Sequence, residues 1–296
     1  MIHTRRWRHC LAVSAAILLS VLIAAPLVHA NDQPTAEHDL LVFGLTRSGH
    51  LVHAHVGAPD KTKDVGRIKG LDHPDTALIG IDFRVQDGLL YGVGNGGGVY
   101  TIDTHNAHAA VVNSLTVPLM GSSFGVDFNP AADRLRIISD TGQNLRHNVN
   151  SGGTTLVDAT LTYTPPPSDP TMPPPLPIPP ALGVVAAAYT NNDLEATTAT
   201  TLFVVDTAMD QIAIQSPANN GILVPTGQLG IDIDAIAGFD IFSDLADGVT
   251  MRNHAFATLL MDGAYSFYQI NLLTGLATFL GDFDKKIIDI AIWLEQ

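Results

Sequence analysis

The chain repeats one short pattern, an aspartate between two apolar residues, in Ile81-Asp82-Phe83, Val126-Asp127-Phe128, Phe239-Asp240-Ile241 and Ile288-Asp289-Ile290. The four aspartates are 45, 113 and 49 residues apart, and the similar stretch Val184–Tyr189, with Ala188 at the aspartate position, divides the long interval into 61 and 52 residues. A period of about 50 residues is typical of the four-stranded blade of a β-propeller. The repeat therefore predicts that each copy is the inner strand of one blade.

Short apolar runs separated by turn residues follow the first four inner strands, as the outer strands of a blade require. The two ends of the chain supply the last blade: Ile287–Leu294 is an inner strand with nothing after it, and Leu40–Thr46, His50–Val56 and Lys63–Ile68 are three strands with no inner strand before them. Joining the ends closes the ring and leaves no free sheet edge between them. We expect an all-β fold, a β-propeller of five four-stranded blades; the alternatives are six or seven blades, or another all-β fold such as a β-sandwich.

The first 30 residues have the three parts of a secretory signal peptide. Arg5, Arg6 and Arg8 form a positive start, an apolar run extends over residues 11–25, and small residues flank a cleavage site after Ala30. The apolar run is shorter than the ~20 residues that span a bilayer, although an uncleaved anchor is the alternative. We expect an exported protein, periplasmic or extracellular, with no membrane span after cleavage.

Composition narrows the class of protein further. The net charge of −14 argues against a nucleic-acid partner, because phosphate contacts need basic patches. Cleavage after Ala30 removes three arginines and no acid, which lowers the charge to −17, and it removes Cys10, the only cysteine. The mature chain therefore has neither a disulfide nor a thiolate metal site, and we expect an acidic monomer stabilised by packing alone.

The domain organisation follows from these features: a signal peptide (1–30), a short linker (31–38) and a single propeller domain (39–296). One segment does not fit the repeat, since residues 165–180 contain ten prolines, which favour polyproline II and lack ladder donors. We interpret this segment as a solvent-exposed insertion between the third and fourth blades. The alternative is a docking segment for a proline-recognising partner.

Several longer stretches resemble one known family. They are Gly125–Pro130 (GVDFNP), Arg134–Arg146 (RLRIISDTGQNLR), Val184–Asn191 (VVAAAYTN) and Ala237–Asp240 (AGFD). Together they are similar to the exported bacterial family of the domain of unknown function 4394, from about Leu40 to Phe283. The resemblance implies a propeller-like repeat fold and no established activity, and it transfers no catalytic residue. The proline-rich insertion departs from the family pattern.

The repeat places Asp82, Asp127, Asp240 and Asp289 at equivalent positions of inner strands, which predicts a partial ring of carboxylates near the central axis. Such a ring has two interpretations. It could bind a cation such as Ca²⁺, which takes several oxygen ligands. Alternatively, each carboxylate accepts backbone N–H bonds from the neighbouring blade and so has a structural role. We expect no cofactor, with Ca²⁺ as the one candidate.

A second group of polar side chains occupies a short stretch: Asp140, Gln143, Asn144, Arg146 and Asn148. Guanidinium and amide groups offer the donors and acceptors that a glycan or an acidic metabolite requires, so these five are candidate ligand-binding residues. The alternative is structural, with a tight turn at Asp140 and an ion pair from Arg136 or Arg146 to Asp140.

The histidines His50, His53 and His55 raise the question of a metal site, because His53 and His55 share one face of a strand. The sequence specifies no third ligand, so an exposed strand face is the better interpretation of these histidines. Whether the protein binds a metal stays unknown from the sequence. No nucleophile, acid–base pair or metal triad is evident. We therefore expect a non-catalytic binding or scaffold protein that presents loops to a protein or a polysaccharide. The alternative is a propeller hydrolase or lyase acting on a sugar or lactone in the central channel.

Overall fold

The computed structural model describes Glu37 and residues 39–163 and 178–294. The predicted signal peptide, most of the predicted linker and residues 165–177 of the proline-rich insertion lie outside this part. Among the described residues, no helix has the length and apolar character needed to cross a membrane.

The described residues form five antiparallel sheets, which we number as blades. Blade 1 consists of β21 (Ile287–Ile292), β1 (Leu41–Thr46), β2 (His50–His55) and β3 (Ala58–Arg67). Blade 2 consists of β4 (Leu78–Phe83), β5 (Leu90–Gly94), β6 (Gly98–Ile102) and β7 (Ala109–Ser114). Blade 3 consists of β8 (Phe124–Asn129), β9 (Arg134–Ser139), β10 (Asn144–His147) and β11 (Thr155–Val157).

The remaining two blades differ in their extra features. Blade 4 consists of β13 (Val184–Tyr189), β14 (Leu202–Asp206), β15 (Gln211–Gln215) and β16 (Ile222–Gln228), with the short β12 (Thr162–Tyr163) added parallel to β16. A 3₁₀ turn, η1 (Ala218–Asn220), lies between β15 and β16. Blade 5 consists of β17 (Ala237–Ala246), β18 (Val249–Met261), β19 (Ala264–Ile270) and β20 (Ala277–Asp282).

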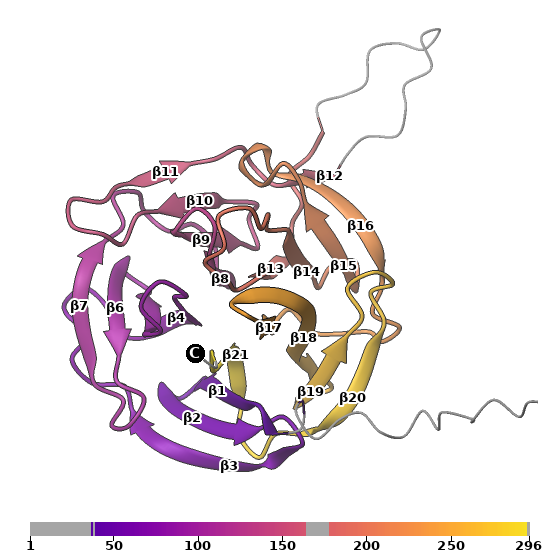
Figure 1. Cartoon of the computed structure of the whole chain (residues 1–296), viewed down its shortest axis with the longest axis horizontal. Helices are drawn as coiled ribbons and strands as arrows, with labels where there is room; N and C mark the ends of the chain where they lie inside the picture. Colours follow the sequence, from indigo (N-terminus) through magenta and orange to yellow (C-terminus); the bar gives the residue numbers. More distant parts are fainter. Residues whose placement is uncertain (1–36, 38, 164–177, 295–296) are drawn as a thin grey trace, which may run out of the picture. The chain divides into compact units, whose positions relative to one another are not determined.

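Figure 1 shows these sheets as a ring in which β4, β8, β13, β17 and β21 are innermost. The prediction of a five-bladed propeller is confirmed. The predicted closure is confirmed too, because β21 pairs with β1 from Val42 opposite Ile292 to Thr46 opposite Ile287. The strand β12 was not predicted, because its two residues are too few to show a strand pattern.

Apolar packing between blades forms the core. Each of five apolar clusters contains residues from two neighbouring blades, so the ring has one cluster at every interface. The inner strands are packed on both faces, and β13 is buried along its whole length. This explains why the inner strands are continuous apolar runs in sequence, whereas an outer strand such as β7 is largely exposed.

The inner strands approach one another closely, and glycine makes this possible. A Cβ atom on Gly125 would lie 2.7 Å from the Cα atom of Ala186 in the next blade, and one on Gly238 would lie 2.5 Å from the Cα atom of Asp289. Both glycines stand two residues before a ring aspartate. The close approach therefore brings the aspartates of neighbouring blades toward one axis.

Candidate functional site

The four predicted aspartates lie on the inner strands β4, β8, β17 and β21, and all are buried. Each carboxylate accepts a backbone N–H bond from the next blade. Asp82 accepts from Phe128 (2.6 Å), Asp127 from Tyr189 (3.0 Å), Asp240 from Ile292 (2.5 Å) and Asp289 from Ile81 (2.8 Å). We call these four residues the aspartate ring. Its bonds are the contacts that the structural interpretation requires.

The electrostatic environment of the ring is unfavourable for full ionisation. Carboxylate oxygens of Asp82, Asp127 and Asp240 lie within 4.8 Å of one another. Burial raises the pKa of Asp82, Asp127 and Asp289 well above its usual value, and repulsion from the other ring carboxylates raises it further. Burial raises the pKa of Asp240 to about 6. The ring therefore holds protons at a pH where exposed aspartates have lost them.

The donor set of the ring suits a Ca²⁺ ion poorly. Ca²⁺ takes six to eight oxygen ligands. Both oxygens of Asp82 and both oxygens of Asp240 already accept backbone N–H bonds. One oxygen of Asp127 makes no hydrogen bond among the described residues. Cation binding at the ring stays a prediction.

Blade 4 lacks a ring aspartate, because Ala188 occupies that position of β13. Asparagine side chains connect blade 4 to blade 5 instead. Asn192 donates to the carbonyl oxygen of Ile241 (2.7 Å), and Asn191 exchanges hydrogen bonds with Asn253 of β18 (3.0 and 2.8 Å). The buried carboxylate of Asp193 adds to these bonds by accepting from the backbone N–H (3.0 Å) and the hydroxyl (2.6 Å) of Thr250 in blade 5.

A cleft of about 670 Å³ opens at the same interface. Its side chains are amides, hydroxyls and apolar groups, and none of them carries a charge: Thr190, Asn191, Thr201, Phe203, Asn253, Gln269, Ile270, Asn271, Leu272, Leu273 and Thr278. We call this hollow the interblade cleft. No side chain that lines it is an acid, a base or a thiol.

Several polar groups of the interblade cleft have no partner within the described part of the protein. The hydroxyls of Thr201 and Thr278 make no hydrogen bond there, and neither does the side-chain nitrogen of Asn271. The Asn271 oxygen, in contrast, accepts from the backbone N–H groups of Leu273 and Thr274 and so fixes the turn. These free groups are available to a ligand.

The five candidate residues of the β9–β10 region are not gathered at one site. Asp140 accepts two bonds from Ser122, and Gln143 bonds to Met120 and Pro118, so both hold the loop before β8. Asn144 and Arg146 point toward blade 4 instead, and Asn148 caps a turn by accepting from the Asn150 N–H. Ligand binding by these residues remains untested.

The predicted ion pair from Arg136 or Arg146 to Asp140 is wrong. Both arginines pair with Asp158, each at 2.6 Å. Arg136 is 2% exposed and also donates to the side-chain oxygens of Asn144 and Asn219. Asp158 was not singled out because it lies on a separate loop, and only the fold brings it to the arginines. This buried network joins blade 3 to blade 4.

The three histidines have separate surroundings. His50 pairs with Asp64 of β3 at 3.0 Å, and His55 contacts the carbonyl oxygen of Asp39. The buried Nδ1 atom of His53 has no hydrogen-bond partner among the described residues, and burial together with the nearby Lys63 lowers the pKa of His53. Among the described residues, no histidine belongs to a group of three potential ligand atoms within 4.8 Å.

Comparison with known proteins settles the family. A model of the domain of unknown function DUF4394 matches residues 50–291, which include the whole aspartate ring. The chain belongs to the DUF4394 family. The resemblance seen in the sequence is thereby confirmed, and the family description assigns no activity. No curated protein matches this family member.

Solved structures similar to this DUF4394 chain have low sequence identity. A protein of Lactobacillus plantarum is 12% identical with a TM-score of 0.41, and the alignment covers 87% of this chain and 99% of that one. A putative 6-phosphogluconolactonase of Bacteroides fragilis is 11% identical with a TM-score of 0.39, and the coverage is 85% and 83%. These alignments transfer no residue role to this chain.

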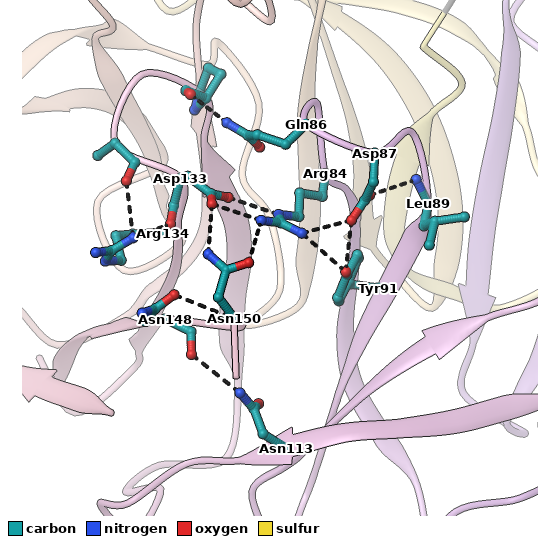
Figure 2. A network of polar contacts seen from close by, with 12 residues as sticks. Arg84, Gln86, Asp87, Leu89, Tyr91, Asn113, Asp133, Arg134, Asn148 and Asn150 are labelled. Atoms are coloured by element: carbon teal, nitrogen blue, oxygen red, sulfur yellow. Dashed lines mark hydrogen bonds and ion pairs between the residues drawn. The ribbon is translucent and has the colours of Figure 1, made fainter. Parts of the chain in front are cut away.

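One further polar network was not found from the sequence. Figure 2 shows Arg84, directly after β4, between Asp87 and Asp133, with Asn150 beside it. Its bonds to Asp133 are both 2.7 Å long and cross from blade 2 to blade 3. Arg84 lowers the pKa of Asp133 by hydrogen bonding to its carboxylate. Arg84 thus joins two blades on the side of the ring where the inner strands end.

Proposed function

We propose that this DUF4394 protein is an exported, non-catalytic binding protein that holds a hydroxyl-rich ligand, a segment of a polysaccharide, in the interblade cleft. One observation carries the proposal: a cleft of about 670 Å³ is lined by hydrogen-bonding and apolar side chains without a single charge. The chain as a whole has a net charge of −14, so an uncharged lining of this size is a distinctive feature.

The chemistry of the lining matches that of a neutral sugar. A sugar presents hydroxyls, which donate and accept hydrogen bonds, around faces made of C–H groups. Amides and threonine hydroxyls supply both donors and acceptors. Phe203 and Leu272 supply apolar surface in the same cleft. A small number of polar groups on a partly apolar wall is the common design of a ligand pocket, and the volume lies within the usual range of roughly 300–1,000 Å³.

The same lining argues for binding rather than catalysis. Hydrolysis or elimination of a sugar requires a general acid or base, or an activated nucleophile, within reach of the bond. Among the described residues, those that line the interblade cleft carry only neutral amides, hydroxyls and apolar groups, and the Glu37 carboxylate behind Gln269 is held by hydrogen bonds to Gln269 and His254. The alternative hydrolase or lyase in the central channel would have to use the aspartate ring. Turnover of a sugar or lactone that is lost in Asp127→Asn with folding retained would support that alternative.

Export is part of the proposal, because polysaccharide ligands lie outside the cytoplasm. We expect cleavage after Ala30, so the mature chain begins at Asn31. Mass spectrometry of the protein purified from the secreting cell gives the cleavage site directly. A mature mass that retains the first 30 residues contradicts export by cleavage. Size-exclusion chromatography with light scattering tests the expected monomer.

The binding test compares hydroxyl deletions inside and outside the interblade cleft. A glycan array selects a ligand, and titration calorimetry measures its affinity. The variant Thr201→Val, Thr278→Val removes two hydroxyls that bond to nothing in the described part of the protein, so the melting temperature should not change. Each hydroxyl that bonds to the ligand is worth about 0.5–1.5 kcal/mol. The affinity should therefore fall roughly fivefold or more.

The matched control is Thr104→Val, which removes an unbonded hydroxyl from the β6–β7 turn of blade 2. Its affinity for the glycan should equal that of the unchanged protein. Equal loss of affinity in the control and the double variant contradicts binding in the cleft. The absence of any glycan that binds contradicts the proposed ligand class.

A further inference from the structure

A second hollow lies at the opposite end of the inner strands. Its volume is about 310 Å³, and the first residues of all five inner strands contribute to it: Ile79, Phe124, Val185, Ala237 and Ile288. We call it the channel mouth. The interblade cleft lies after the end of β13 at Thr190, whereas the channel mouth lies at the start of the same strand at Val185. The two hollows are therefore separate sites.

Of the described residues that line the channel mouth, Arg47 alone has a charged side chain. It is exposed, and its only side-chain hydrogen bond among the described residues is a long one of 3.4 Å to the Tyr265 hydroxyl. No carboxylate within that part of the chain pairs with it. A guanidinium has five N–H donors in a planar fork that fits a carboxylate. Most of these donors have no partner within the described part of the chain.

The other polar residues of the channel mouth are occupied by the fold. Asn95 bonds to Thr76 through both its oxygen and its nitrogen, and Ser122 donates to Asp140. Ser123 donates to the carbonyl oxygen of Ala235. The rest of the lining is apolar. The channel mouth thus combines an apolar wall with one free cationic group at its rim.

The positive charge continues beside Arg47. An adjoining hollow of about 410 Å³ is lined by Arg47 together with Lys285 and Lys286. Asp284 is the one acid there, and it lies 3.6 Å from the ammonium group of Lys285. The described part of the chain has only 12 basic residues, and three of them meet at this rim. An acidic protein that keeps a positive rim on one pocket attracts anions to that pocket.

We propose that the channel mouth binds a small organic monocarboxylate, with its apolar body in the pocket and its carboxylate on Arg47. A volume of about 310 Å³ lies at the lower end of the usual range for ligand pockets, roughly 300–1,000 Å³, and so favours a small ligand. The head group stays at the rim because the aspartate ring lies deeper along the same strands, with Asp289 directly after Ile288. This site is independent of the proposed polysaccharide cleft.

Titration calorimetry with octanoate tests this inference, because octanoate has an apolar chain and one carboxylate in about the right volume. We expect Arg47→Met to weaken octanoate binding roughly tenfold or more, which equals about 1.4 kcal/mol. The control Lys61→Met removes one exposed positive charge from β3, outside both hollows, and should leave the affinity within about twofold because salt screens distant surface charges.

Two further probes separate the head group from the apolar body. Octan-1-ol lacks the charge, so it should bind more weakly than octanoate and be insensitive to Arg47→Met. Acetate lacks the body and should not compete with octanoate. The inference is overturned by unchanged octanoate affinity in Arg47→Met, by equal binding of acetate and octanoate, or by no octanoate binding at about 1 mM.

Discussion

Replacing Asp127 by asparagine should stabilise the protein at pH 8. One oxygen of Asp127 accepts the Tyr189 N–H at 3.0 Å, and an asparagine oxygen can keep that bond. The other oxygen makes no hydrogen bond among the described residues, and an oxygen of Asp127 lies within 4.8 Å of carboxylate oxygens of Asp82 and Asp240, so the charge of Asp127 repels theirs. The substitution therefore removes a buried charge and keeps the bond that joins blade 3 to blade 4.

The magnitude follows from linkage between protonation and folding. A carboxyl whose pKa is raised in the folded state stabilises the protein at low pH. That stability is lost as pH rises from the unfolded pKa of 3.8 through the folded value. For comparison, the rise of the Asp240 pKa from 3.8 to about 6 changes the unfolding free energy by about 3 kcal/mol between low and high pH. We expect the unfolding free energy of Asp127→Asn to exceed that of the unchanged protein by up to about 3 kcal/mol at pH 8, and by almost nothing at pH 4.

Asp82→Asn is the matched comparison, because it makes the same charge change within the same ring. Both oxygens of Asp82 accept backbone N–H bonds, from Phe83 at 2.7 Å and Phe128 at 2.6 Å. An asparagine there must direct its NH₂ group at one of these N–H donors. The lost bond and the unsatisfied donor cost about 1–3 kcal/mol, so the gain at pH 8 should be smaller by that amount.

Urea denaturation followed by circular dichroism at pH 4 and pH 8 measures all three proteins. Equal stability of Asp127→Asn and the unchanged protein at pH 8 would refute the reasoning, as would a gain of the same size at both pH values. The same titration with EDTA or Ca²⁺ tests the cation interpretation. A cation at 100 times its Kd would add about 2.7 kcal/mol to the unchanged protein. Such a gain would show that the ring charges are neutralised by an ion and not by protons.

Three further predictions concern the contacts between blades. Arg136→Met should lower the unfolding free energy by about 1–3 kcal/mol, because it leaves the side-chain oxygens of Asn144 and Asn219 without this donor while Asp158 keeps its pairing with Arg146; a loss below about 1 kcal/mol in urea denaturation contradicts this. Gly125→Ala should cost about 1–3 kcal/mol and lower the melting temperature, because the new methyl group meets the backbone of blade 4; an unchanged melting temperature would show that the strands separate freely. Arg84 lowers the pKa of Asp133, so this pair adds stability above the unfolded pKa and loses it as pH falls through the lowered value. In Arg84→Met, the unfolding free energy should therefore fall less steeply as the pH is lowered. An unchanged pH dependence would contradict a stabilising pair between Arg84 and Asp133.

The sequence was sufficient for the fold because each inner strand carries its own local signal. The bounds of β13 follow from the apolar run of Val184–Tyr189 even though Ala188 breaks the aspartate pattern. Contacts between blades have no such signal. Arg84 bonds to Asp133, which lies 49 residues away in the sequence, and to Asn150, which lies 66 residues away. These pairings depend on the conformation of the loops that carry the residues. Loop conformation is harder to predict from sequence than the position of a strand.

The position of the interblade cleft is connected to the one gap in the aspartate ring. Four of the five interfaces have a carboxylate of one inner strand bonded to the backbone of the next. At the fifth interface, Ala188 offers no acceptor, and the amides of Asn191 and Asn192 together with the carboxylate of Asp193 supply the cross-blade bonds farther along the chain. A carboxylate bond would fix the interface at the axis and place another buried charge there. Without that bond, the connections between the two blades lie after the end of β13, and the amides of Asn191 and Asn253, which are among them, line the interblade cleft where we propose that the ligand binds.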